Sequence, residues 1–157
     1  MHQNNKDFIS RFYSSLQTLN YQEMQRAYHD DAEFSDPVFG TLNSAEVKVM
    51  WQMLLTKSKD LQISFNNIHA NQTTGECRWE AWYTFSKTGR AVHNIINSSF
   101  EFKDDKIFRQ HDSFDLWRWS RYALGPSGIV LGWTPWIRNK IRASARGSLE
   151  KFMGVGV

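Results

Sequence analysis

The sequence has only one cysteine, Cys77, among its 157 residues. A single cysteine can form no internal disulfide and no cysteine-based metal cluster, so a reducing compartment is the simpler inference. Long apolar runs are also missing, since none approaches the roughly eighteen residues of a transmembrane helix. The first residues have neither the basic start nor the apolar run of a secretory signal. We therefore expect a cytoplasmic protein.

Several catalytic signatures are missing as well. No glycine-rich phosphate loop or dinucleotide fingerprint follows a predicted strand. The serines between residues 10 and 15 lack the glycines of a nucleophile elbow, and Cys77 falls on an inward strand face, where a thiol is usually inert. The histidines lack metal-ligand spacing, and His93 and His111 fall on outward strand faces. We expect no cofactor, no metal and no covalent catalysis.

Aromatic residues, by contrast, make up 15% of the chain and include 7 Trp and 11 Phe. Side chains of this size can build either a thick core or the wall of an apolar cavity. The length of the chain fits one domain. These features favour a single domain around one small-molecule pocket.

The first sixty residues predict three helices. An apolar period of 3.6 predicts a helix over about 5–18, and a shorter second helix is expected to begin after Asn20 and to include Tyr28. The third is expected after Asn43, which forms a plausible capping box with Glu46. Between the second and third helices the chain should be extended and then turn, because a proline biases the residue before it away from helical angles.

From residue 60 the apolar period changes to 2, which predicts strands. The alternation predicts strands over 60–66 and 76–85, a third that carries Val92 to Phe102, and a last one that carries Phe108 to Leu116. Three helices followed by a strongly bent antiparallel meander predict an α+β fold, shaped as a cone with the helices packed on the sheet.

A Gly-Pro-Ser-Gly run at 125–128 is the one plausible boundary, so we expect a cone domain over 1–124 and a helical extension over 125–157. The net charge is +3, yet the end of the chain is strongly basic, and by difference the remainder carries about −1. Its bases, opposed there only by Glu150, are Arg138, Lys140, Arg142, Arg146 and Lys151. Such an element could meet an anionic membrane surface or nucleic acid. A solvated basic face, on a helix that packs over the cone or a partner subunit, is the commoner case. We therefore expect no nucleic acid and no stable membrane insertion.

The most informative residues are polar ones on apolar strand faces, because an unpaired polar group is costly to bury and tends to be kept at functional sites. Asp112 shares a face with Phe114, Asn94 and Ser98 alternate with apolar residues, and Tyr83 lies among aromatic ones. If these faces all point inward, a carboxylate, an amide, a hydroxyl and a phenol converge on one apolar cavity.

A carboxylate in such a cavity should have a raised pKa, since desolvation disfavours its charged form. Raised values of this kind tune a general acid or base toward neutral pH, which makes Asp112 the first catalytic candidate. The alternative is structural, with Asp112 bonded to a backbone amide or an arginine at the mouth of the sheet.

The segments Ala32–Pro37 and His111–Asp115 are similar to motifs of a known family. Over about residues 5–124 it resembles the SnoaL-like branch of the nuclear transport factor two-like superfamily, a cystatin-like cone of bent sheet and helices around a ligand cavity. Members include polyketide cyclases, limonene epoxide hydrolase and ketosteroid isomerase, beside pocket proteins of no known activity. The resemblance therefore implies a fold more firmly than a reaction.

The resemblance also implies roles for particular residues. The acid or acid-base group of the cyclases and the epoxide hydrolase falls on Asp112, and Asp36 becomes a possible second carboxyl group. The epoxide hydrolase has a water-activating Arg and Asp at two positions where this chain has Trp79 and Ala81, so that pair is missing here. The resemblance therefore favours single-residue proton transfer of the cyclase or isomerase kind. Tyr83 or Asn94 would stabilise a developing enolate. The residues expected to contact substrate are Trp79, Asn94, Ile96, Ser98, Phe114 and Trp51.

Three functions stay open on the sequence. The first is an enzyme that does general acid/base chemistry on a hydrophobic metabolite in this pocket. The second is a non-catalytic binder that uses the same pocket. The third is a scaffold whose interior is filled by its own side chains, Trp79 among them. We expect a homodimer for two reasons. Trp82 and Ile95 on the outer sheet face suggest that this face is partly covered, and dimerisation through the sheet is common in the family that the chain resembles.

Overall fold

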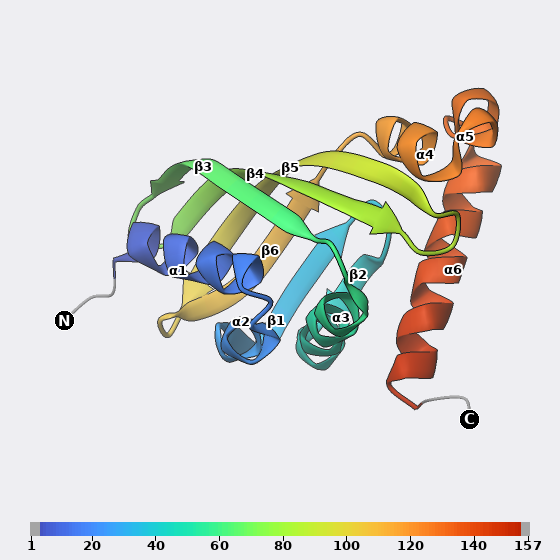
Figure 1. Ribbon diagram of the computed structural model, residues 1–157. Coiled ribbons are helices and arrows are strands. Elements are labelled where there is room, and N and C mark those ends of the chain that lie inside the picture. Colours follow the sequence, from blue (N-terminus) through green and yellow to red (C-terminus); the bar gives the residue numbers. More distant parts are fainter. Residues whose placement is uncertain (1–3, 155–157) are drawn as a thin grey trace.

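The computed structural model describes residues 4–154 and contains one curved, six-stranded sheet with helices on one face and at one end (Figure 1). The helices are α1 (Asn5–Gln17), α2 (Tyr21–Arg26), α3 (Ser44–Lys57), α4 (Leu116–Leu124), α5 (Pro126–Leu131) and α6 (Pro135–Phe152). The strands are β1 (Tyr28–Asp36), β2 (Gly40–Asn43), β3 (Gln62–Ala70), β4 (Thr74–Phe85), β5 (Arg90–Lys103) and β6 (Lys106–Ser113).

The strand order is β2-β1-β6-β5-β4-β3. Neighbouring strands are antiparallel except β1 and β6, which run parallel with Ser35 opposite His111. The sheet is therefore mixed, and the prediction of a wholly antiparallel sheet was wrong at this pairing. The sequence period could not reveal it, because β1 and β6 lie far apart in the chain and meet only through tertiary structure.

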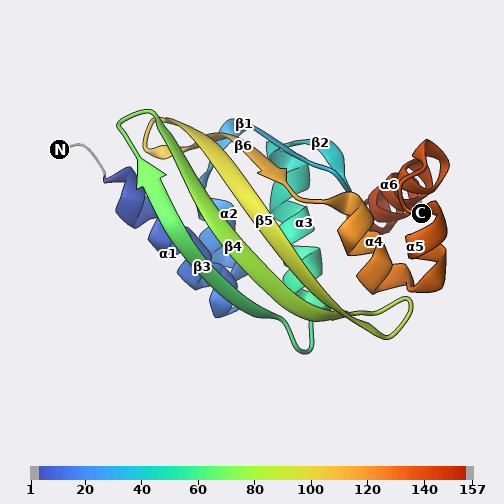
Figure 2. The ribbon, with the colours of Figure 1, turned by 90° about the horizontal axis from the view of Figure 1, so that it is seen from above.

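Local sequence signals explain the three N-terminal helices, which Figure 2 shows crossing one face of the sheet. Asn4 and Asn20 accept hydrogen bonds from the first turns of α1 and α2. The predicted capping box at α3 is confirmed: Asn43 accepts from the Glu46 backbone N–H, and the Glu46 carboxylate accepts from the Asn43 N–H.

The predicted elements differ from the structure at two junctions. The second helix ends at Arg26, and Tyr28 is the first residue of β1 instead of a helical residue. The last strand ends at Ser113, and Leu116 begins α4. Asp115 is the cause of the second change, because its carboxylate caps the N-terminus of α4 by accepting from the Arg118 N–H.

An irregularity in β6 also changes which residue faces inward. The β5–β6 register shifts between Glu101 and Phe102, so that Phe102 lies opposite Ile107. Ile107 is fully buried, whereas Phe108, which the alternation placed inside, is half-buried. Beyond the shift the predicted phase holds, and Gln110 and Asp112 both point inward.

The C-terminal helices form a compact end of the molecule (Figures 1 and 2). The 125–128 run is a tight joint between α4 and α5, where Gly125 has φ +67 and a Cβ on Gly128 would lie 2.0 Å from the Ser120 carbonyl oxygen. The predicted helix over 136–153 is α6. Its Leu149 is buried in the same core cluster as the N-terminal helices.

Candidate functional site

Asp112 lies on β6 opposite Ser98 of β5, with 4% of its surface exposed. Its Oδ1 accepts one hydrogen bond from Ser98 Oγ at 2.6 Å and another from Gln110 Nε2 at 3.0 Å. The second oxygen, Oδ2, receives no hydrogen bond from any residue between 4 and 154. Because Oδ1 is already used twice, the proton of the neutral acid belongs on Oδ2, and that oxygen is the one free to exchange it.

Burial raises the pKa of Asp112 from 3.8 to about 6, although the hydrogen bonds from Ser98 and Gln110 lower it again in part. No arginine or lysine pairs with this carboxyl group among the described residues. The structural alternative of a salt bridge therefore has no partner here. A carboxyl group tuned this close to neutrality can both release and take up a proton under ordinary conditions.

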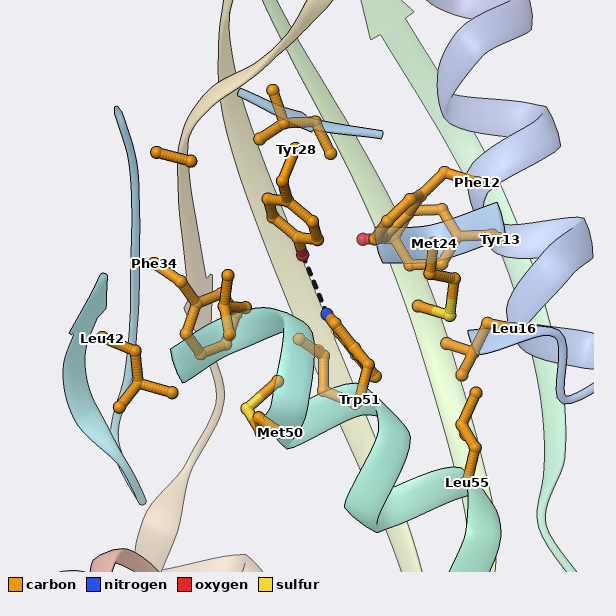
Figure 3. Packing of buried hydrophobic residues seen from close by; sticks show 14 of the residues in the cluster. Phe12, Tyr13, Leu16, Met24, Tyr28, Phe34, Leu42, Met50, Trp51 and Leu55 are labelled. Atoms are coloured by element: carbon orange, nitrogen blue, oxygen red, sulfur yellow. Dashed lines mark hydrogen bonds between the residues drawn. The ribbon is translucent and has the colours of Figure 1, made fainter. Parts of the chain in front are cut away.

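A relay of hydrogen bonds holds Gln110 in place beside Asp112. Trp51 Nε1 donates to the Tyr28 hydroxyl at 2.8 Å, as Figure 3 shows, and that hydroxyl donates to Gln110 Oε1 at 2.5 Å. Gln110 can then present only its NH₂ group to Asp112, so the amide orientation is fixed from α3 through β1.

Trp79 occupies the other side of Asp112. Its Nε1 donates to Ser98 Oγ at 2.8 Å, which leaves the Ser98 proton for Asp112. The ring is buried with its centroid 5.5 Å from that of Tyr13 on α1. Trp79 therefore fills space inside the cone, and its polar edge supports the carboxylate indirectly.

Tyr13 is the one buried tyrosine whose hydroxyl has no hydrogen-bond partner within the described part of the chain. In Figure 3 this hydroxyl points from α1 into the interior, on the side of Tyr28. Burial is the main cause that raises its pKa, the Asp112 charge raises it further, and the nearby Ser98 hydroxyl lowers it. Its position thus leaves one unused donor close to the carboxyl group.

Asp36 supplies a second carboxyl group at the end of β1. Its Oδ1 accepts from the backbone N–H groups of Val38 and Phe39, at 2.9 and 2.5 Å, and so closes the turn into β2. Burial raises its pKa to about 7; the Phe39 N–H opposes this shift, and the Asp112 charge adds to it. The two carboxyl groups are therefore near enough to influence one another.

Tyr83 lies between Asp36 and the C-terminal helices. Its hydroxyl accepts from Trp119 Nε1 at 2.7 Å, so its own proton remains available for donation. Burial raises its pKa, the Trp119 bond lowers it, and the Asp36 charge raises it. Unlike Asp112, both Asp36 and Tyr83 are half-buried, which places them between the interior and solvent.

The remaining predicted contact residues lie along the same inward strand face. Ile96 is buried in the core, and Asn94 is buried with a side-chain amide that makes no hydrogen bond within residues 4–154. Phe114 is half-buried and packs against both the main core and the smaller cluster under α4. Val38 and Tyr83 also touch both clusters, so these residues lie where the main core meets the smaller cluster under α4.

Two hollows are described on the surface, and Asp112 lines neither of them. The larger, about 740 Å³, is lined by Glu33, Ser99, Arg109 and other side chains of the outer sheet face. The smaller, about 410 Å³, includes Asn94 and Phe114 in its lining. Neither hollow reaches Asp112, so a substrate could meet this carboxyl group only if the side chains packed around it move.

The outer face carries His93 and His111, as predicted. His93 stacks on Trp82 with ring centroids 4.8 Å apart and bonds Glu80, while His111 Nδ1 lies 2.7 Å from Ser35 Oγ. No group of three or more metal-ligating side chains occurs among residues 4–154. No helix of that part of the chain is long and apolar enough to cross a membrane.

Sequence reasoning missed four residues that support the site: Tyr13, Tyr28 and Trp119 from other elements, and Gln110 from β6 itself. Gln110 alternates with Asp112 along the last predicted strand, and that spacing was a usable signal. Tyr28 was predicted to be helical, and Tyr13 falls within the first predicted helix. Trp119 had no signal, because α4 itself was not predicted.

Comparisons with known proteins agree with this architecture. The model of the SnoaL-like domain family matches residues 9–110. No protein of curated function matches the sequence.

Among solved structures, an LEH-like epoxide hydrolase of M. tuberculosis shares 16% identity over 78% of this chain and 89% of its own, with a TM-score of 0.61. IdmH of Streptomyces antibioticus, a proposed polyketide cyclase, shares 16% identity over 72% of this chain and 93% of its own, with a TM-score of 0.61. An NTF2-like protein of unknown function from Cytophaga hutchinsonii shares 13% identity over 70% of this chain and 98% of its own, with a TM-score of 0.58. At these identities the likeness concerns the fold.

Proposed function

This chain belongs to the SnoaL-like domain family, and on that premise we propose that it is an enzyme of general acid/base chemistry, of the cyclase or isomerase kind. Its substrate is a hydrophobic metabolite with a carbonyl group. The observation that carries the proposal is Asp112, a buried carboxyl group whose pKa is about 6 and whose Oδ2 makes no hydrogen bond within the described chain.

The proposed step is a proton transfer at carbon. The Asp112 carboxylate takes a proton from the carbon next to the substrate carbonyl, and the electron pair of that C–H bond forms an enolate. Either the same proton is returned to another carbon, or the enolate carbon attacks a second carbonyl within the substrate and the new alkoxide takes the proton back from Asp112. No oxidant, reductant or metal is required by this balance.

The enolate oxygen needs hydrogen-bond donors that are already in place. Tyr13 and Tyr83 both have hydroxyl protons without an acceptor among residues 4–154, one on each side of the carboxyl pair. Asp36, with its pKa of about 7, still holds a proton in much of the population when Asp112 is mostly ionised. The pair thus divides into a base, Asp112, and an acid, Asp36.

The apolar surroundings favour a hydrophobic substrate. Tyr83, Val38 and Phe114 are partly buried and pack on both apolar clusters, while Ile96 and Trp79 are buried in the main core. An anionic metabolite would be repelled by the ionised Asp112 carboxylate, and a charge of either sign would lose its hydration on entering this apolar interior.

The test is turnover by Asp112→Asn against a panel of hydrophobic carbonyl compounds and epoxides, followed by mass spectrometry. The amide keeps an oxygen that can accept from Ser98 and Gln110, so the variant should fold. We expect a loss of kcat/KM of about 100-fold or more. The matched control is Asp105→Asn in the exposed β5–β6 turn, which should keep full activity.

The alternative, a non-catalytic binder or a dimeric scaffold, gives different results. A binder would show no turnover with any compound, and its ligand affinity would be unchanged in Asp112→Asn. A scaffold would bind no compound, and substitution of Trp82 on the outer sheet face would dissociate a dimer. Either result would end the enzyme proposal.

A further inference from the structure

The end of the molecule formed by α4, α5 and α6 exposes unusually large apolar side chains. Val130, Trp133, Trp136 and Ile129 have 65%, 63%, 61% and 55% of their surface exposed, whereas no other large apolar residue described as exposed exceeds 39%. We call these four residues the tryptophan tip. A cluster of this kind marks a surface that meets another apolar phase.

Two indole hydrogen bonds tie neighbouring segments of this end to α5. Trp133 Nε1 donates to the Val130 carbonyl at 3.0 Å, which holds the indole against α5. Trp117 Nε1 on α4 donates to the Ile129 carbonyl at 3.3 Å. The segments therefore lie together at the end of the molecule that Figure 2 shows beyond the sheet.

Charge is segregated onto the same helices. From residue 116 to residue 149 the sequence contains no Asp or Glu and six bases, a formal charge of +6, so the remainder carries −3. The six bases are Arg118, Arg121, Arg138, Lys140, Arg142 and Arg146. This asymmetry is sharper than the net charge of +3 suggests.

Most of these cations have no carboxylate partner within the described chain. The one ion pair they form is Arg146 with Glu46 at 3.6 Å. Instead, the Arg121 guanidinium lies 4.3 Å from the Trp117 ring centroid, and Lys140 Nζ lies 5.0 Å from that of Trp136. Positive charge without a carboxylate partner therefore borders indole rings, of which that of Trp136 is exposed and that of Trp117 half-buried.

We propose that this end of the molecule docks on bilayers that contain anionic phospholipid. The tryptophan tip enters the interface between headgroups and acyl chains, where indole rings are favoured, and the surrounding bases meet the lipid phosphates. No described helix can span a membrane, so the protein lies on the surface without crossing it. Docking of this kind agrees with the expectation of no stable insertion.

The same observations disfavour the other occupants. A second copy that packed tip to tip would bring the bases of two copies together, and between residues 116 and 152 each copy has only Glu150 to oppose them. A nucleic acid would use the bases but would leave the aliphatic side chains of Ile129 and Val130 without a partner. A lipid surface satisfies both the charge and the apolar area.

The test is co-sedimentation of the full chain with phosphatidylcholine vesicles, with and without about 30 mol% phosphatidylglycerol, at low and high salt. We expect binding to the anionic vesicles, weaker binding at high salt, and little binding to phosphatidylcholine alone. Failure to bind anionic vesicles at low salt would overturn the proposal.

Two variants separate the apolar and electrostatic parts. Trp133→Ser with Trp136→Ser should weaken partition by roughly tenfold or more per indole. Arg138→Glu with Lys140→Glu should weaken it at least about 25-fold, since each base near an anionic surface contributes about fivefold. The controls are Leu54→Ser, an exposed leucine on α3, and Lys59→Glu, an exposed lysine; both should bind like the wild type.

Two further readouts distinguish the competing partners. Light scattering after size exclusion would show a dimer that the tryptophan variant dissociates, and fluorescence anisotropy with a labelled oligonucleotide would show binding that the same variant loses. Either outcome overturns membrane docking by the tip. So does vesicle binding that responds to the charge variant and is unchanged in the tryptophan variant.

Every variant is also checked by thermal unfolding, since the four tip residues are exposed and their loss should not affect folding.

Discussion

At Asp112 the hydrogen bonds from Ser98 and Gln110 compete with burial. Burial predominates, because the pKa of Asp112 is about 6 in the folded protein against an ordinary value of 3.8. The folded state therefore holds the proton more tightly than the unfolded chain between these two values. The free energy of unfolding should fall as pH rises from about 4 to about 6 and then level off, with Asp36 extending the fall toward pH 7.

Asp112→Asn removes the contribution of the more deeply buried of the two carboxyl groups to this pH dependence. A shift of about two pKa units corresponds to roughly 3 kcal/mol, so the variant should lose up to about that difference in unfolding free energy between pH 4 and pH 8. Urea unfolding at both pH values measures it. Asp105→Asn should keep the wild-type difference. A full pH dependence in Asp112→Asn would mean that the Asp112 carboxyl group is hydrated in solution.

Tyr13 and Tyr28 form a natural matched pair, since both are fully buried and only one has a bonded hydroxyl. Tyr28→Phe breaks the bonds to Trp51 and Gln110 and should lose about 1 to 3 kcal/mol of unfolding free energy. Tyr13→Phe removes an unpaired hydroxyl and should leave stability unchanged or slightly higher. Chemical unfolding of both variants checks this, and a large loss in Tyr13→Phe would show that its hydroxyl is bonded in solution.

At the scale of elements, α6 is fastened to the cone at several points. Arg142 and Arg146 donate to backbone carbonyls of the β1–β2 region, those of Pro37, Phe39 and Thr41. Farther along the helix, Leu149 is 2% exposed within the main core. Part of the basic helix thus packs over the cone, which is the commoner arrangement expected for such a helix. Arg138 and Lys140 remain exposed.

Leu149→Ala tests how much this attachment contributes. A cavity at a buried leucine costs about 2 to 5 kcal/mol, so the melting temperature should fall by several degrees and α6 should lose amide protection first. Leu54→Ala on α3 is the control, because that side chain is exposed and its loss should cost little. A neutral Leu149→Ala would show that α6 detaches in solution without affecting the core.

The elements also show what a sequence can predict. The Asn43 capping box and the alternation of β4 and β5 are local patterns, and both appear in the structure as predicted. The parallel β1–β6 pairing, the register shift that turns Phe108 outward, and the bond from Trp119 to Tyr83 depend on residues far apart in the chain. The alternation placed Asp112 inward, whereas its supporting relay through Tyr28 and Trp51 required the fold.

At the scale of the whole molecule, the two proposals meet on α4. Trp117 on this helix bonds α5 beside the tryptophan tip, and Trp119, two residues later, bonds Tyr83 of the proposed site. The positive end that would approach an anionic surface is therefore joined through α4 to the proposed site, and we expect a hydrophobic substrate to reach the carboxyl pair from this side.

A substrate dissolved in the bilayer should consequently be turned over faster when the vesicles are anionic. We expect kcat/KM for such a substrate to rise on addition of phosphatidylglycerol vesicles for the wild type, and to stay low for Trp133→Ser with Trp136→Ser. A water-soluble substrate should be turned over equally by both proteins, because the tip lies outside the site. If the tryptophan variant were equally fast on both substrates while failing to bind vesicles, docking would serve some purpose other than substrate delivery. Loss of both activities in Asp112→Asn, with vesicle binding intact, would show that chemistry and docking belong to separate residues of one end of the molecule.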